Sequence, residues 1–133
     1  MEQIDGKTIL VVEDDEVNRK LMRVVLTGRN YQVREAESVS AALAALHDGK
    51  PDLLLLDIRL GDGTGFDVVR ELRADHRFDD VPAVAITAQA MKGDEGRILA
   101  AGFDGYLPKP IDTRALPAVV EHYLRAGRGV GHE

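Results

Sequence analysis

The chain has 133 residues, of which 44% are hydrophobic and 30% charged, and its net charge is −6. This composition is typical of one globular domain and excludes a disordered chain. The negative net charge argues against non-specific binding to nucleic acid or anionic lipid, since an acidic surface does not attract either polyanion. The sequence has no cysteine, which excludes disulfides and thiol nucleophiles, and no apolar run approaches the roughly 20 residues that span a bilayer.

Strand and helix patterns alternate through the first part of the chain. The β-branched run 8–12 predicts a strand, and residues 16–28 predict an amphipathic helix. The apolar face of that helix is predicted from four residues at helical spacing: Val17, Leu21, Val24 and Val25. Another side, either a flank of the core or a docking surface for a partner helix, carries Asn18, Met22 and Leu26. A short strand at 31–36 follows, and then a helix capped by Ser38 or Ser40.

The run 51–57 stands at the centre of the sequence and places four leucines between two aspartates. A short continuous apolar run of this kind predicts a strand that is buried on both faces. Its last residue, Asp57, would lie at the carboxyl end of a central strand, where open α/β sheets place their chemistry. The glycine-rich segment 61–65 that follows is predicted to be a flexible loop.

The rest of the chain continues the alternation. Its elements are expected as a helix around 66–72, a turn at 79–82, a strand at 83–87, a helix at 91–101, a strand at 103–107, a helix capped by Asp112 or Thr113, and a frayed tail at 127–133. The helix at 91–101 contains Gly93 and Gly96, and each costs up to about 1 kcal/mol relative to alanine. We therefore expect it to be the least stable helix. Five strands alternating with five helices predict a doubly wound α/β domain with a parallel sheet.

Polar side chains follow four of the five predicted strands. They are Glu13 and Asp14 after the first strand, Asp57 at the end of the third, Thr87 at the end of the fourth and Lys109 after the fifth. Because parallel strands end at one edge of the sheet, we expect these side chains to meet. Three neighbouring carboxylates need a cation, and oxygen ligands favour Mg²⁺, with Mn²⁺ as an alternative. With a lysine and a hydroxyl beside them, the set fits phosphoryl transfer to Asp57.

These motifs resemble the receiver domain of the two-component response regulator family over nearly the whole chain. The motifs that carry the resemblance are the segments 9–15, 51–57, 85–88 and 109–110. The resemblance implies a flavodoxin/CheY-like fold with strand order 2-1-3-4-5. It also implies that Asp57 is the phosphoacceptor, and that Glu13 and Asp14 hold Mg²⁺ together with Asp57 and the backbone carbonyl of Arg59.

The resemblance also assigns roles to the residues near the fourth and fifth strands. By it, Thr87 and Lys109 bind the phosphoryl group, Tyr106 is an aromatic switch, and the Lys109–Pro110 peptide bond is cis. Residues 87–95 are similar to stand-alone receivers of the DivK type. Arg59 and Gln89 flank the site and should tune the hydrolysis of the phosphate.

The implied protein is a bacterial, cytoplasmic signalling protein and not an enzyme. We expect a receiver domain at 1–126, in a monomer or weak dimer, and a flexible tail at 127–133. A histidine kinase or a histidine phosphotransfer protein would supply the phosphoryl group. A downstream protein effector would respond to a change in the face of the fourth helix, fifth strand and fifth helix, with no nucleic acid or membrane involved.

Four alternatives stay open at this point. The chain could be a phosphate shuttle or sink in a phosphorelay, or the receiver of a hybrid kinase. A haloacid-dehalogenase-like phosphohydrolase would need an Asp-x-Asp-x-Thr pattern after the first strand, where this chain has four acids at 13–16. A small-molecule binder of the flavodoxin type would need a phosphate-binding loop at that place, and the acids would repel a phosphate that lacks a metal.

Overall fold

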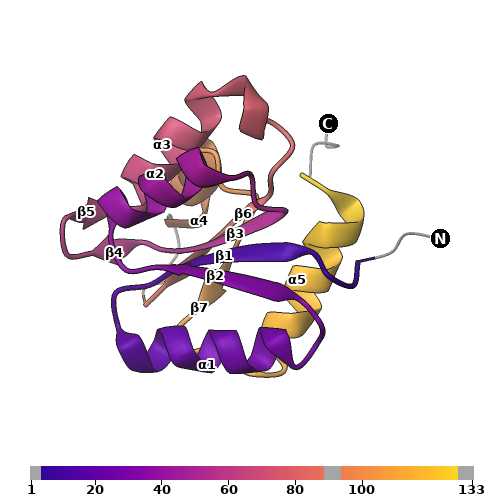
Figure 1. Ribbon diagram of the computed structural model, residues 1–133. Helices are drawn as coiled ribbons and strands as arrows, with labels where there is room; N and C mark the ends of the chain where they lie inside the picture. The colour runs from indigo at the N-terminus through magenta and orange to yellow at the C-terminus, as the bar shows by residue number, and fades with distance from the viewer. Residues whose placement is uncertain (1–3, 89–93, 129–133) are drawn as a thin grey trace.

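The computed structural model describes residues 4–88 and 94–128. Five parallel strands form its main sheet in the order β2-β1-β3-β6-β7 (Figure 1). Their bounds are Thr8–Val12 for β1, Gln32–Ala36 for β2, Leu53–Asp57 for β3, Ala83–Thr87 for β6 and Gly105–Pro108 for β7. Counted among these five strands, the order is 2-1-3-4-5, so the predicted fold class and strand order are confirmed.

Helices cover both faces of this sheet (Figure 1). Two of them, α1 (Glu16–Thr27) and α5 (Ala115–Ala126), pack on one face. Three others, α2 (Val39–Asp48), α3 (Gly65–Ala74) and α4 (Asp94–Ala100), pack on the opposite face. A short 3-10 helix, η1 (His76–Phe78), follows α3. None of the helices in the described ranges has both the length and the apolar composition needed to cross a bilayer.

The central strand β3 is buried along its whole length. Leu54 and Leu56 join the apolar cluster under α2, α3 and α4, whereas Leu53 and Leu55 join the cluster under α1 and α5. Alternate side chains of a strand point to opposite faces, so the four-leucine run fills both cores at once. The prediction of a strand buried on both faces is confirmed. Asp57 is the last residue of this strand.

The face that α1 turns to the core differs from the sequence prediction. Met22 and Leu26 are fully buried, whereas Val17 is 74% exposed and Val24 is 56% exposed. The helix carries two adjacent apolar rows, and positions four apart share a row, so the sequence pattern alone does not decide which row faces the sheet. The predicted apolar face was therefore wrong at Val17 and Val24, and the Met22–Leu26 side belongs to the core.

The segment after Asp57 is a hairpin where the sequence predicts a flexible loop. Its two short strands are β4 (Arg59–Leu60) and β5 (Gly63–Thr64), which pair antiparallel. The Gly65 amide donates to the Ile58 carbonyl at 2.8 Å and closes the hairpin onto β3. A Cβ atom on Gly65 would lie 2.6 Å from the Asp57 carbonyl oxygen. Gly65 thus permits a close approach of α3 to the end of β3. The glycine serves this packing contact and does not indicate a mobile loop.

The helix ends settle two further expectations. Ser38, and not Ser40, caps α2, since its Oγ accepts from the Ala41 amide at 3.0 Å. Asp112, and not Thr113, accepts from the amides at the start of α5, those of Ala115 and of Arg114 just before it. Arg128, which belongs to the predicted tail, donates from its Nε to Asp104 Oδ1 at 2.9 Å. The first part of the predicted fourth helix, with Gly93, and residues 129–133 of the predicted tail lie outside the described residues.

Candidate functional site

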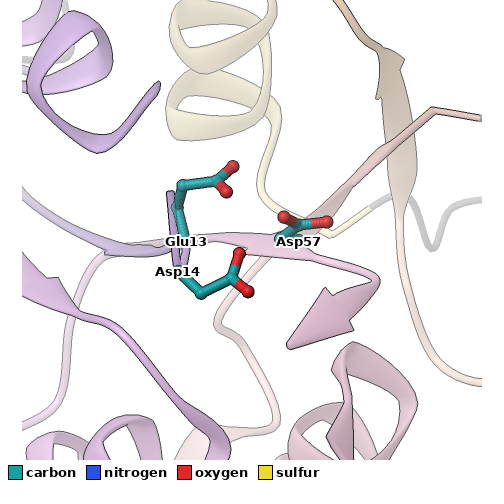
Figure 2. A group of neighbouring side chains, drawn as sticks. All are labelled: Glu13, Asp14 and Asp57. Carbon is teal, nitrogen blue, oxygen red and sulfur yellow. The ribbon is translucent and has the colours of Figure 1, made fainter. Parts of the chain in front are cut away.

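The predicted polar residues meet at the carboxyl edge of the sheet. Glu13 and Asp14 follow β1, Asp57 ends β3, Thr87 ends β6 and Lys109 follows β7. Carboxylate oxygens of Glu13, Asp14 and Asp57 all lie within 4.8 Å of one another. Figure 2 shows these three side chains gathered around one space. The topology of a parallel sheet brings them together although β1 and β3 are far apart in the sequence.

Glu13 is the most deeply placed of these acids, with no exposed surface. Its amide donates to the Ala36 carbonyl at 3.0 Å, and its carbonyl accepts from Arg19 Nη1 at 2.9 Å, so the backbone is fixed on both sides. One carboxylate oxygen, Oε2, accepts from the Asp15 amide, while Oε1 is buried and has no hydrogen-bond partner. Burial, together with Asp57, raises the pKa of Glu13 to about 7.

Asp57 presents a carboxylate that is held at both oxygens and is only 2% exposed. Its Oδ1 accepts from the Arg59 amide at 3.1 Å, and its Oδ2 accepts from Lys109 Nζ at 2.8 Å. Charge-assisted bonds of this kind hold a carboxylate in one orientation. The side chain is therefore aimed at the shared space, with a cation on one side of it.

Lys109 is the one cation that forms ion pairs with the acids of this cluster in the described part of the chain. Burial alone would lower its pKa, but the bond to Asp57 and the charges of Asp57 and Glu13 outweigh that effect and raise it. The Lys109 amide donates to the Thr87 carbonyl at 2.8 Å, which ties the end of β7 to the end of β6. The Lys109–Pro110 peptide bond is cis.

A cavity of about 250 Å³ opens beside Asp57. Thr87, which is 6% exposed, lines it together with Lys109 on the polar side. Its other wall includes Phe66, Arg97 and Ile98, and the Arg97 guanidinium lies 4.8 Å from the centre of the Phe66 ring. A carboxylate, an ammonium and a hydroxyl thus border one space that can accept a small anion.

Tyr106 lies on β7, and its side chain is engaged by α4. The Tyr106 hydroxyl donates to Glu95 Oε2 at 2.6 Å. That bond, with some burial, raises the pKa of Tyr106. Gln89, which the sequence places at the border of the site, lies outside the described residues.

The arrangement is suited to a divalent metal ion. Three carboxylates lie near a single lysine, and the buried Glu13 Oε1 has no hydrogen-bond partner, with Lys109 Nζ 3.6 Å away. A buried carboxylate oxygen without a hydrogen bond is costly in an acidic cluster unless a cation or a proton satisfies it. All of these ligands are carboxylate oxygens, which hard ions such as Mg²⁺ prefer.

Four residues near the site have no signal in the sequence that singled them out. Arg19 holds the Glu13 carbonyl, and Glu95 holds Tyr106. Arg97 lines the cavity, and Asp62 at the tip of the hairpin binds the start of α2. Arg97 contacts Phe66, and Asp62 contacts Val39 and Ser40, all far away in the sequence, so no local spacing could have indicated these two residues.

Comparisons with known proteins agree with this geometry. A family model described as the response regulator receiver domain matches residues 9–121. The polar-differentiation response regulator DivK of Brucella ovis is 36% identical over 118 residues, which is 89% of this chain and 96% of the relative.

Two solved structures are similar over most of their lengths. A putative response regulator from Chloroflexus aurantiacus has a TM-score of 0.86 at 29% identity, with 91% of this chain and 99% of the other covered. The receiver domain of sensor histidine kinase PA1611 from Pseudomonas aeruginosa has a TM-score of 0.83 at 32% identity, with 90% and 98% covered. That second structure has a magnesium ion coordinated in its active site cleft.

Proposed function

Because the chain belongs to the response regulator receiver domain family, we propose that it accepts a phosphoryl group on Asp57 and signals in that state. The donor is a phosphohistidine of a sensor kinase or of a histidine phosphotransfer protein. The observation that carries the proposal is the placement of Asp57, buried at the end of β3 between a lysine and two further carboxylates. The receiver unit spans 1–126, residues 127–133 form a tail, and the chain turns over no other substrate.

Glu13, Asp14 and Asp57, with the backbone carbonyl of Arg59, would hold Mg²⁺, and Mn²⁺ could take its place. The fit rests on the three carboxylates, whose oxygens lie within 4.8 Å of one another, and on the buried Glu13 oxygen that has no hydrogen-bond partner. When bound, the ion neutralises the negative charge of the carboxylates and of a phosphoryl group beside them.

The transfer itself requires positioning more than covalent help. One Asp57 oxygen attacks the phosphorus in line, a P–O bond forms, and the P–N bond to the histidine breaks. The leaving imidazole nitrogen keeps the bonding electron pair and takes up a proton. Lys109 Nζ, which donates a hydrogen bond to Asp57 Oδ2 in the structure, can donate instead to a phosphoryl oxygen. The Thr87 hydroxyl, which lines the same cavity, can donate to another phosphoryl oxygen.

The donor needs a surface on which its histidine reaches Asp57. The helix α1 begins three residues after Glu13 and exposes Val17 and Val24. Exposed apolar side chains beside a reaction site favour a contact with another protein. In our proposal the donor docks on the exposed side of α1 that carries Val17 and Val24. The Met22–Leu26 side, which the sequence offered as an alternative docking surface, is buried in the core.

The output follows from the change of charge at Asp57. A phosphoryl group would draw the Thr87 hydroxyl toward itself and open space on the α4 side of β7. Tyr106 would then leave Glu95 and turn inward, and the face of α4, β7 and α5 would change. Such a switch is a shift between two populated states that a local charge biases.

Phosphorylation can be tested with phosphoramidate, whose P–N bond resembles that of phosphohistidine. Wild type, Asp57→Ala and the control Asp52→Ala, which changes the other aspartate of the 51–57 run, are incubated with the donor and Mg²⁺. We expect wild type and Asp52→Ala to gain one phosphoryl group by intact mass, and Asp57→Ala to gain none. Equal labelling of Asp57→Ala would contradict the proposal.

A further inference from the structure

The tip of the β4–β5 hairpin is bound to the beginning of α2. Asp62 Oδ1 accepts from the Val39 amide at 2.7 Å, and Asp62 Oδ2 accepts from the Ser40 amide at 3.1 Å. Both oxygens of one side chain are thus engaged by backbone amides of another element, 22 and 23 residues away in the sequence. These two bonds hold the pKa of Asp62 below its usual value.

The other residues of the hairpin are closely packed as well. Leu60 is 7% exposed and packs in the core under α2 and α3. A Cβ atom on Gly63 would lie 2.7 Å from Asp67 Oδ2 and 3.1 Å from Val39 Cγ2. The hairpin therefore lies tightly between the first turns of α2 and α3, and Asp62 is the group that bonds it to α2.

Arg59 stands at the base of this hairpin, next to the acidic cluster. It pairs with Thr64 across the hairpin, and its amide donates to Asp57 Oδ1. A side-chain ligand such as the exposed Asp14 can adjust to a metal ion by rotating side-chain bonds, but a backbone carbonyl moves only with its strand. The position of the Arg59 carbonyl is thus set by the hairpin as a whole.

We propose that Asp62 is a positioning residue for the magnesium site, because it ties the hairpin to α2 and thereby fixes the Arg59 backbone. This inference rests on the proposed function, since it requires that the carboxylates and the Arg59 carbonyl bind Mg²⁺. Residues that orient metal ligands commonly change metal affinity by about 10- to 100-fold, and Asp62 acts through one ligand only. We therefore expect a loss at the low end of that range.

A simpler role for Asp62 would be to cap α2, and the chain offers a matched control for it. Ser38 Oγ caps the same helix through the Ala41 amide at 3.0 Å, without contact to the hairpin strands in the hydrogen bonds that the structure describes. Ser38→Ala therefore weakens the start of α2 but leaves both Asp62 bonds in place. Asp62→Asn keeps one acceptor oxygen and should restore part of the effect of Asp62→Ala.

The experiment measures Mg²⁺ binding to the full chain by isothermal titration calorimetry, because the sequence has no tryptophan to report on it. Wild type, Asp62→Ala, Asp62→Asn and Ser38→Ala are titrated with magnesium chloride, and thermal melting without metal checks their folding. We expect the dissociation constant to rise about tenfold in Asp62→Ala and less in Asp62→Asn, and to change less than twofold in Ser38→Ala.

The outcomes separate this inference from the function on which it rests. Unchanged affinity in Asp62→Ala, or an equal loss in Ser38→Ala, would overturn the positioning role while the magnesium site stands. If wild type itself bound no Mg²⁺, the proposed metal site would fail, and the inference with it. An Asp62→Ala variant that fails to fold leaves Asp62→Asn against Ser38→Ala as the deciding pair.

Discussion

The two ends of the sheet both bury carboxylates beside cations, but they balance the charge differently. At the amino edge, before β7, the side chain of Asp104 is 5% exposed. It accepts from Arg73 Nη2 at 3.0 Å, from the Ala83 amide at 2.9 Å and from Arg128 Nε at 2.9 Å. At the carboxyl edge, Lys109 pairs with two of three neighbouring carboxylates, those of Glu13 and Asp57, and one oxygen of Glu13 has no hydrogen-bond partner.

The difference distinguishes a structural cluster from a functional one. The Asp104 cluster joins the end of α3, the first residue of β6, the residue before β7 and Arg128 after α5, and its acid is fully satisfied. The acidic cluster around Asp57 carries an excess of negative charge, which lowers stability until a cation arrives. Local arrangements that oppose stability are expected at functional sites, where a ligand completes them.

The largest expected effect is on stability at the amino edge. Asp104→Ala leaves Arg73, whose side chain is 15% exposed, without its charged partner. Breaking one side of a buried pair costs about 3–5 kcal/mol, so we expect the free energy of unfolding in urea to fall by that order. Labelling of Asp57 by phosphoramidate should persist at temperatures where the variant is folded.

A matched control is the exposed pair of Glu121 and Arg125 on α5. Their side chains are 46% and 48% exposed, and Glu121→Ala should cost less than about 0.5 kcal/mol. If Asp104→Ala were as mild as Glu121→Ala, or if it abolished labelling while folded, the division between a structural and a functional edge would be wrong.

The second effect concerns the acid at the carboxyl edge whose pKa is raised. A carboxyl group with a folded pKa above its unfolded value stabilises the protein below the unfolded pKa, and this contribution is lost as the pH rises through the folded pKa. For Glu13 the window runs from 4.5 to about 7. Without metal, we expect the unfolding free energy to fall across it by on the order of 3 kcal/mol relative to Glu13→Gln.

Urea unfolding at pH 5 and pH 7.5, with and without Mg²⁺, measures this effect. Added Mg²⁺ should reduce the loss in wild type, because a cation can neutralise the ionised carboxylate in place of a proton. The lowered pKa values of Asp62, Asp67 and Asp112 act in the opposite direction, and their contribution is lost only as the pH falls through the acid range below this window. If the unfolding free energy of wild type and that of Glu13→Gln changed equally between the two pH values, the raised pKa of Glu13 would be refuted.

Much of the carboxyl edge could be predicted from the sequence, and little of the amino edge. Asp57 is marked by the apolar run before it, and parallel topology alone brings Glu13 and Lys109 to the same edge. Asp104, Arg73 and Arg128 have no common spacing and follow no apolar run, so only the fold shows that they meet.

The same reasoning explains the predictions that failed. The orientation of α1 was wrong because Val17 and Met22 belong to adjacent apolar rows of one helix, and tertiary packing decides between them. The hairpin after Asp57 was missed because glycine indicates conformational freedom in sequence, while Gly63 and Gly65 serve close contacts with Asp67 and Asp57.

The smallest expected effect tests the strand that joins the two edges, since β7 carries Tyr106 and lies between Asp104, which precedes it, and Lys109, which follows it. Glu95→Ala removes the acceptor of the Tyr106 hydroxyl, and losing one hydrogen bond shifts an equilibrium by about two- to tenfold. The phenol should also return toward its ordinary pKa, because the bond to Glu95 is the main cause of the rise.

Ultraviolet titration of the tyrosines measures that change, and the difference between each protein and its Tyr106→Phe variant isolates Tyr106 from Tyr31 and Tyr123. If Tyr106 is held outward by Glu95, Glu95→Ala should lower its pKa and also speed labelling of Asp57 by about two- to tenfold, because the inward state no longer competes with that bond. Glu95→Gln, which keeps an acceptor without the charge, should lie between the two. A lowered pKa with an unchanged labelling rate would mean that Tyr106 does not communicate with Asp57, and that the two ends of β7 act independently.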